Sequence, residues 1–171
     1  MIKHDQVFFS SKLSSVALIF LVGLIFLSIF IPFLSPYYQD IYGSVHFEIA
    51  GQPPSFSHWF GTDTAGRDMF TITIRAAFYS LKIAVGVVFL SVLVGLPIGM
   101  LSGVSNKKTD EIIMRITDGF LAFPPMILPL AITAILGPSL NNVIIGISVS
   151  WFPWYVRIAR SQSLVISSSD Y

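Results

Sequence analysis

Three long stretches without a charged residue constrain what this chain can fold into. No Asp, Glu, Lys or Arg occurs in residues 13–39, 83–106 or 119–156. In lipid the backbone polar groups must pair with one another, so membrane-spanning segments are helices or closed barrels, and a helix needs about 20 apolar residues to cross about 30 Å of hydrocarbon. No alternation with a period of two residues indicates a barrel. The charge-free stretches therefore predict an all-α integral membrane protein.

The composition leads to the same class. Of the 171 residues, 54% are hydrophobic and 11% are charged, whereas soluble domains carry about 25% charged residues. A net charge of +1 without a basic tract gives no reason to expect a nucleic-acid partner. The absence of cysteine excludes disulfides and thiolate chemistry, and His4, His46 and His58 lack the spacing of metal ligands. We expect neither a metal nor a cofactor.

Four transmembrane helices are predicted from these stretches. The first lies within residues 13–34 and is longer than the about 7–15 apolar residues of a signal peptide, so we interpret it as an uncleaved anchor. The second has its core at 83–100. The third stretch is too long for one crossing, and its Gly-Pro and paired Asn at 136–142 predict a turn that divides it into 119–136 and 143–156.

The distribution of Lys and Arg predicts a cytoplasmic N-terminus, because cytoplasmic segments carry the excess of these residues. In that orientation seven of them lie inside and three outside. The seven are Lys3, Lys12, Lys107, Lys108, Arg115, Arg157 and Arg160, and the three are Arg67, Arg75 and Lys82. We therefore divide the chain into an N-terminal segment with its anchor helix (1–36), an extracytoplasmic loop (37–78) and a core of the remaining helices (79–171).

The segment HWFGTDTAGRDMF, residues 58–70, is unusually polar for this chain. It lacks the Lys and the preceding strand of a P-loop, so it is not a phosphate cradle. Two of its carboxylates, Asp63 and Asp68, allow an alternative function as a membrane-anchored aspartyl hydrolase. Such an enzyme would need these groups at membrane depth with raised pKa values. Both lie instead in a loop beside Arg67, so we expect no enzyme.

A structural role for the same segment is the preferred interpretation. Thr62, Asp63 or Thr64 would cap the start of the second helix, with acidic groups near its positive end. Gly61 and Gly66 would permit tight turns.

Prolines inside the predicted helices are candidate hinges. Each proline removes a backbone hydrogen bond and clashes with the preceding turn. The candidates are Pro97 in the second helix, Pro124 and Pro125 in the third, which also holds Pro129, and Pro153 in the fourth. Gly95 and Gly99 form a GxxxG pattern that permits close helix approach. Kinked helices suit a transporter that rocks or gates, and they equally suit an ordinary bundle.

The charges beside the third and fourth helices have local explanations. Glu111 and Arg115 are spaced i,i+4 and Arg115 and Asp118 are spaced i,i+3, so one helix face can neutralise itself. Arg157 and Arg160 follow an apolar, aromatic stretch, where arginine side chains typically extend to the membrane interface.

The chain resembles a known family in three blocks that occur in order. The first is a proline-rich stretch followed by the pattern of His58, Gly61, Thr62, Asp63, Gly66, Arg67 and Asp68. The second covers residues 110–145 and the third covers residues 150–171. This combination resembles the second permease subunit of ABC importers of the oligopeptide, dipeptide and nickel class, over nearly the whole chain.

The resemblance implies a multi-pass protein of the prokaryotic inner membrane that moves solutes by alternating access. The implied partners are a second permease subunit, two cytoplasmic ATPase subunits, an extracytoplasmic solute-binding protein and membrane lipid. The resemblance also places Arg157, Arg160, Asp170 and Tyr171 on the side that the ATPase approaches. The resemblance does not indicate whether the transported solute is a peptide, nickel or another small solute.

Two departures from the family pattern carry expectations of their own. Thr71 lies near a position where the family commonly has Ser, and the following Arg is displaced to Arg75. The sequence stops at Asp170 and Tyr171, where the family continues into a Glu-Ala-Ala loop that contacts the ATPase. We therefore expect the first four helices of a six-helix permease, unable by itself to couple ATP hydrolysis to movement. An assembly factor or remnant without transport is the alternative.

Overall fold

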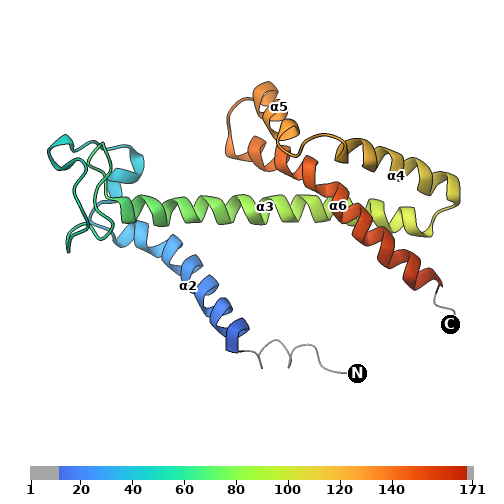
Figure 1. The fold of residues 1–171 in the computed structure, drawn as a ribbon, viewed down its shortest axis with the longest axis horizontal. Coiled ribbons are helices and arrows are strands. Elements are labelled where there is room, and N and C mark those ends of the chain that lie inside the picture. Colours follow the sequence, from blue (N-terminus) through green and yellow to red (C-terminus); the bar gives the residue numbers. More distant parts are fainter. Residues whose placement is uncertain (1–11, 169–171) are drawn as a thin grey trace. The chain divides into compact units, whose positions relative to one another are not determined.

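The computed structural model describes residues 12–168, and it describes residues 31–34 by their backbone alone (Figure 1). The regular elements in this range are helices joined by loops, and the sole extended pairing there is an isolated bridge between Thr62 and Asp68. The helices are α2 (Lys12–Leu34), η1 (Tyr38–Tyr42), η2 (Phe47–Ile49), α3 (Met69–Val104), α4 (Lys107–Leu121), α5 (Ile127–Leu136) and α6 (Leu140–Ser168). Two compact units divide the chain within α3, one up to Leu81 and one from Lys82.

Helix α2 is apolar on all sides. It has 23 residues, which at 1.5 Å per residue gives about 35 Å, enough to cross the hydrocarbon core. Large side chains all around it are exposed, among them Leu13 (79%), Ile19 (71%) and Phe20 (68%). Water does not favour such a surface, so α2 is a helix suited to lipid.

Helix α3 is longer than the predicted second crossing. It begins at Met69 and has 36 residues, or about 54 Å. Residues 83–104 of the charge-free stretch form its C-terminal part, and its N-terminal part extends back into the segment predicted as loop, 37–78. Among the described residues, α2 and α3 are the two helices long and apolar enough to cross a membrane.

The expectation of one continuous helix at 119–136 is wrong. Helix α4 ends at Leu121, residues 122–126 are not helical, and α5 starts only at Ile127. Pro124 and Pro125, predicted as hinges inside a helix, lie in this break. Adjacent prolines remove two backbone donors and disfavour helical geometry at the residue before each of them, which explains the interruption. Helix α5 has 10 residues and spans only about 15 Å.

The turn predicted at 136–142 is confirmed. Gly137 has a positive φ of 89°, and the side-chain amide of Asn142 donates to the carbonyls of Leu136 (3.0 Å) and Gly137 (2.9 Å). These bonds satisfy carbonyls that the end of α5 leaves without a helical partner. Helix α6 then runs from Leu140 to Ser168 and contains the predicted crossing at 143–156.

Glycines let α3 and α6 approach closely in the unit from Lys82. Gly95, Gly99 and Gly103 are spaced four apart on α3, and Tyr155, Ala159 and Ser163 are spaced four apart on α6. A Cβ atom built on these glycines would lie 2.6, 2.6 and 2.5 Å from the Cβ atoms of the three α6 residues in turn. The close approach predicted from the GxxxG pattern is therefore confirmed, and it continues for one further turn.

The prolines inside helices α3 and α6 are Pro97 and Pro153. Each lies in the part of its helix that takes part in this contact, and Pro153 is buried. Their role as hinges stays a prediction.

Candidate functional site

The 58–70 segment forms a tight turn whose shape depends on two glycines. Gly61 has φ 73° and Gly66 has φ 76°, a backbone region that residues with a Cβ rarely adopt. Each glycine is also pressed against another part of the chain, since a Cβ on Gly61 would collide with the carbonyl oxygen of Gln52 and one on Gly66 with that of His46. Both positions therefore exclude larger residues for two separate reasons.

Asp63 closes this turn. Its Oδ1 accepts hydrogen bonds from the backbone N–H of Ala65 (2.8 Å) and of Arg67 (2.9 Å). Its Oδ2 accepts from Nε of Arg67 at 2.8 Å and pairs with Nη2 at 2.6 Å. The backbone N–H of Arg67, followed by its guanidinium, lowers the pKa of Asp63 below its usual value. The carboxylate thus acts as the acceptor that holds the turn closed.

The N-cap of α3 is not one of the three residues predicted from the sequence. The helix begins at Met69, and Oδ1 of Asp68 accepts from the backbone N–H of Thr71 at 2.7 Å. Asp68 is therefore the cap, and the prediction of Thr62, Asp63 or Thr64 is wrong. Thr62 instead accepts from the backbone N–H of Gln52 (2.9 Å) and donates to the carbonyl of Ile49.

Asp68 also lies at the centre of a buried polar network. Its side chain is 3% exposed, and Oδ2 lies 3.0 Å from Nδ1 of His58. Its backbone N–H donates to Oδ2 of Asp40 at 2.8 Å, and Oδ1 of Asp40 lies 3.3 Å from Nε2 of His46. The sequence alone did not indicate Asp40 or the roles of His46 and His58. The interacting residues of this network lie up to 28 positions apart in the sequence, in η1 and in the loop.

This network ties the loop to the start of α3. The ring of Tyr37 packs against His58 with centroids 4.5 Å apart, and the hydroxyl of Thr71 on α3 lies 2.7 Å from that of Ser35, just after α2. Asp63 and Asp68 have separate partners and do not form a carboxylate dyad. Within residues 12–168 no cluster of three or more His, Asp or Glu side chains is placed to hold a metal ion.

Aromatic side chains cover a cavity beside this network. The cavity has a volume of about 440 Å³, with Tyr37, Phe56, Trp59 and Phe70 in its walls and Asp68 and Thr71 among its polar lining. Trp59 and Phe60 both contact the ring of Phe70, at 4.9 and 5.2 Å between centroids. Phe56 is fully exposed.

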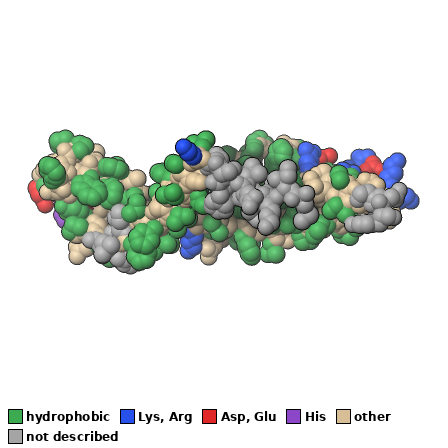
Figure 2. All heavy atoms as spheres, turned by 90° about the horizontal axis from the view of Figure 1, so that it is seen from below, with side chains coloured by type: hydrophobic (Ala, Val, Ile, Leu, Met, Phe, Trp, Pro, Cys, Tyr) green, Lys and Arg blue, Asp and Glu red, His purple; other side chains and the backbone are tan. Residues whose placement is uncertain are grey.

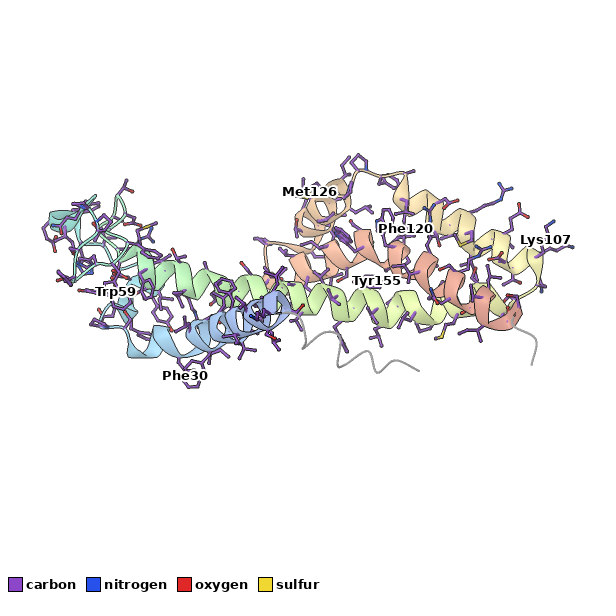
Figure 3. The ribbon with its side chains drawn as sticks, turned by 60° about the horizontal axis from the view of Figure 1, so that its bottom comes forward. Phe30, Trp59, Lys107, Phe120, Met126 and Tyr155 are labelled. Carbon is purple, nitrogen blue, oxygen red and sulfur yellow. The ribbon has the colours of Figure 1, made fainter. Side chains whose placement is uncertain are left out.

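In the unit from Lys82, two arginines of α6 pair with two carboxylates of α4. Arg160 binds Asp110 through Nε–Oδ1 (2.5 Å) and Nη2–Oδ2 (2.7 Å), and Arg157 Nη2 lies 2.6 Å from Oδ1 of Asp118. The hydrogen bonds from Arg160, and then from Ser102, lower the pKa of Asp110 to about 2. Figure 2 shows basic and acidic side chains gathered at one end of this unit, where Figure 3 places Lys107.

The structure tests the two ion pairs that the sequence predicts within α4. The i,i+4 pair of Glu111 and Arg115 is confirmed, with Nη2–Oε1 at 2.7 Å. The expected Arg115–Asp118 pair is wrong, because the carboxylate of Asp118 binds Arg157 instead. Asp170 and Tyr171, predicted with Arg157 and Arg160 on the ATPase side, lie outside the described residues.

Comparison with known proteins gives matches along most of the chain. Residues 95–171 match the family described as the binding-protein-dependent transport system inner membrane component, and residues 6–54 match the N-terminal TM domain of oligopeptide transport permease C. Together with the apolar helices and the glycine contact of α3 and α6, these matches define the class. Residues 6–54 and 95–171 thus match two domains of inner membrane permeases of binding-protein-dependent transport systems.

Among such permeases the similarity is to peptide permeases of the C type. The chain is 36% identical over 161 residues to the probable D,D-dipeptide transport system permease protein DdpC of Escherichia coli (strain K12), covering 94% of this chain and 53% of the relative. It is 37% identical over 164 residues to the oligopeptide transport system permease protein OppC of Bacillus subtilis (strain 168), covering 96% and 53%. The chain spans about half the length of the curated relatives it matches.

Proposed function

We propose that this chain is a transmembrane permease subunit of an ABC importer that moves peptides or a related small solute by alternating access. The observation that carries the proposal is the similarity to dipeptide and oligopeptide permeases over 94–96% of the chain. The proposed partners are a second permease subunit, two cytoplasmic ATPase subunits and an extracytoplasmic solute-binding protein, and the proposed location is the prokaryotic inner membrane. The ATPases supply the energy.

The proposed topology has a cytoplasmic N-terminus and four membrane segments. Helices α2, α3 and α6 provide three of them. The remaining segment, 119–136, consists of the end of α4, the break at 122–126 and the short helix α5. Broken helices are tolerated at membrane depth where they lie against protein or line a cavity. Residues 1–36 and 79–171 then correspond to the anchor and the permease core, and residues 37–78 to an extracytoplasmic segment that includes the start of α3.

Roles for the individual residues follow from this topology. The signature residues Gly61, Thr62, Asp63, Gly66, Arg67 and Asp68 shape the outer loop and fix where α3 begins. Arg157 and Arg160 hold α4 on α6 at the cytoplasmic end, the side that the ATPase approaches. Pro97 and Pro153 are hinge candidates, whereas Pro124 and Pro125 keep 122–126 out of a helix.

The function is tested by uptake in the host cell. Deleting the gene should abolish accumulation of radiolabelled Ala-Ala or Ala-Phe-Ala, and a plasmid copy of the gene should restore it. Unchanged uptake of both peptides, with loss of accumulation of ⁶³Ni²⁺ instead, would reassign the solute. Unchanged uptake of all three probes would overturn the proposal.

The topology is tested separately by single cysteines introduced into these 171 residues, which contain none of their own. An impermeant maleimide added to intact cells should label Gln52→Cys and Asn141→Cys. Lys108→Cys and Ser161→Cys should react only after the membrane is opened. Labelling of Lys108→Cys from outside would contradict the orientation, and labelling of Ser161→Cys from outside would contradict the number of segments.

A further inference from the structure

We propose that a cavity in the unit from Lys82 binds an apolar side chain of the transported peptide and that the Ser150 hydroxyl donates a hydrogen bond to a peptide carbonyl. This inference rests on the proposed function and deepens it. The cavity has a volume of about 400 Å³ and is lined by Phe120, Phe123, Pro125, Ser150, Trp151 and Trp154, among others. It lies between the end of α4, the break before α5 and the middle of α6.

The aromatic walls come from elements that hold one another in place. The ring of Phe120 packs edge to face against Phe152 of α6, with centroids 5.1 Å apart, and Figure 3 shows Phe120 at the end of α4. On the α5 side, a Cβ on Gly146 would lie 2.9 Å from Cα of Pro129, so α5 and α6 are in backbone contact. Small-molecule sites commonly combine such apolar walls with a few polar groups.

Ser150 supplies a polar group without a partner. It is 9% exposed, and its Oγ has no hydrogen-bond partner among the described residues. Other serines of α6 donate to a carbonyl three or four residues earlier, as Ser148 does to Ile144 (2.7 Å) and Ser161 to Ile158 (2.8 Å). A buried hydroxyl left unpaired is unfavourable, and a bound molecule can supply the missing partner.

The helix break at 122–126 brings irregular backbone to the same cavity. Phe123 and Pro125 belong to this break and line the cavity. Irregular backbone at membrane depth is tolerated only beside protein or a cavity, and in many secondary transporters the substrate site is formed where membrane helices are discontinuous. The unpaired hydroxyl and the break are thus two independent features of one cavity.

The chemistry of the lining selects the occupant. A lipid acyl chain fills aromatic walls but offers the hydroxyl no acceptor. A helix of a partner subunit offers carbonyls that already accept a bond within their own helix, so the hydroxyl could add only a second bond there, as Ser148 does to Ile144. A short peptide has both an apolar side chain and free carbonyls. None of the described residues lining the cavity is charged, so the site recognises a side chain and an inner peptide group rather than the termini.

The test uses photo-crosslinking in membranes that contain the complete transport system. The probe is the tripeptide Ala-benzoylphenylalanine-Ala, and adducts on this chain are located by mass spectrometry. We expect adducts on Phe123, Trp151 or Trp154 that excess Ala-Phe-Ala suppresses. Ser150→Ala should raise the half-saturating probe concentration about 3- to 10-fold, the effect of one lost hydrogen bond. Ile135→Ala, which changes an exposed α5 residue outside the lining, should leave it unchanged.

A parallel arm uses a phosphatidylcholine with a diazirine on its acyl chain. Adducts on the same residues from this lipid alone, with none from the peptide, would overturn the proposal in favour of a lipid site. An unchanged half-saturation in Ser150→Ala would overturn the assigned role of the hydroxyl. If uptake of Ala-Phe-Ala is normal while the peptide adducts lie elsewhere, the cavity proposal fails and the proposed function stands. If the unmodified system neither takes up Ala-Phe-Ala nor forms peptide adducts, both the proposed function and the cavity proposal are contradicted.

Discussion

Arg160 on α6 and Asp110 on α4 are joined by two parallel hydrogen bonds of 2.5 and 2.7 Å across 50 positions of sequence. The hydroxyl of Ser102 on α3 donates to the same carboxylate at 2.5 Å. One acidic side chain therefore connects three helices at the end of the bundle where α3 turns into α4. The planar guanidinium suits this paired geometry better than an ammonium group would.

Replacing Asp110 by Ala should destabilise the bundle. The substitution leaves the Arg160 side chain, which is 30% exposed, without its acceptors. We expect a loss of about 1–3 kcal/mol, measured by thermal unfolding in detergent with circular dichroism. Arg115→Ala is the matched control, because its pair with Glu111 is 77% and 55% exposed and should contribute only about 0.3–0.5 kcal/mol. Equal effects of the two substitutions would contradict this role of Asp110.

The same pair predicts a dependence of stability on pH. Arg160 and Ser102 lower the pKa of Asp110 from 3.8 to about 2, so the unfolded chain takes up the proton at a higher pH than the folded protein does. The contribution of Asp110 to stability is then fully present above about pH 4 and is lost as the pH falls through about 2. The difference in melting temperature between the unmodified protein and Asp110→Asn should shrink over this interval. A difference that stays constant down to about pH 2 would argue against it.

The helical class could be predicted from the sequence because a long stretch without charged residues indicates a segment surrounded by lipid, where the backbone must be helical. The sequence predicted the Glu111–Arg115 pair because that pair is local. It did not predict Arg160–Asp110 or Arg157–Asp118, since each depends on how α4 packs against α6. Apolar composition predicts one helix at 119–136, but it does not report the local backbone effect of Pro124 and Pro125, which interrupts that helix.

Gly99 should not tolerate even a methyl group. A Cβ there would collide with the carbonyl oxygen of Val156 and lie 2.6 Å from Cβ of Ala159, so α3 and α6 would have to separate. We expect Gly99→Ala to cost about 1–3 kcal/mol of unfolding free energy. Gly119→Ala is the control, because Gly119 lies in α4 and a Cβ built on it would have no atom within 4 Å. This substitution should stabilise the protein by up to about 1 kcal/mol, because alanine has the higher helix propensity. Equal melting temperatures for the two variants would exclude a tight α3–α6 contact.

Gly66 tests the shape of the loop in the same way. Gly66→Ala meets both an unfavourable φ of 76° and a collision with the His46 carbonyl, so we expect a loss above about 2 kcal/mol. Gly43→Ala separates the two causes, since Gly43 has φ 92° but open space around it and should lose only about 1–2 kcal/mol. Limited proteolysis of the 37–68 loop in detergent would report the difference. A Gly43 variant cleaved as readily as the Gly66 variant would refute the contact with His46.

The loop shows where sequence reasoning stops. The glycines, Asp63 and Arg67 form a local turn, and their pattern indicated one. Thr62, Asp63 and Thr64 are all good capping residues, so the local sequence predicts a cap before Asp68, and nothing local indicates that Thr62 bonds to Gln52 and Ile49 instead. The burial of Asp68 beside His58 and Asp40 results from the folding of the whole loop.

Asp68 combines two functions that substitution can separate. Asp68→Asn keeps an oxygen that can accept from the backbone N–H of Thr71, whereas Asp68→Ala loses both this cap and the partner of His58. We expect Ala to cost about 1–2 kcal/mol more than Asn, because losing a cap typically costs that much and His58, 7% exposed, would be left beside an apolar methyl group. Thermal unfolding and proteolysis between residues 35 and 68 measure the two effects. If Asp68→Asn destabilises the protein as much as Asp68→Ala does, the carboxylate beside His58 contributes more to the start of α3 than the cap. The helix start then depends on the buried network more than on local capping.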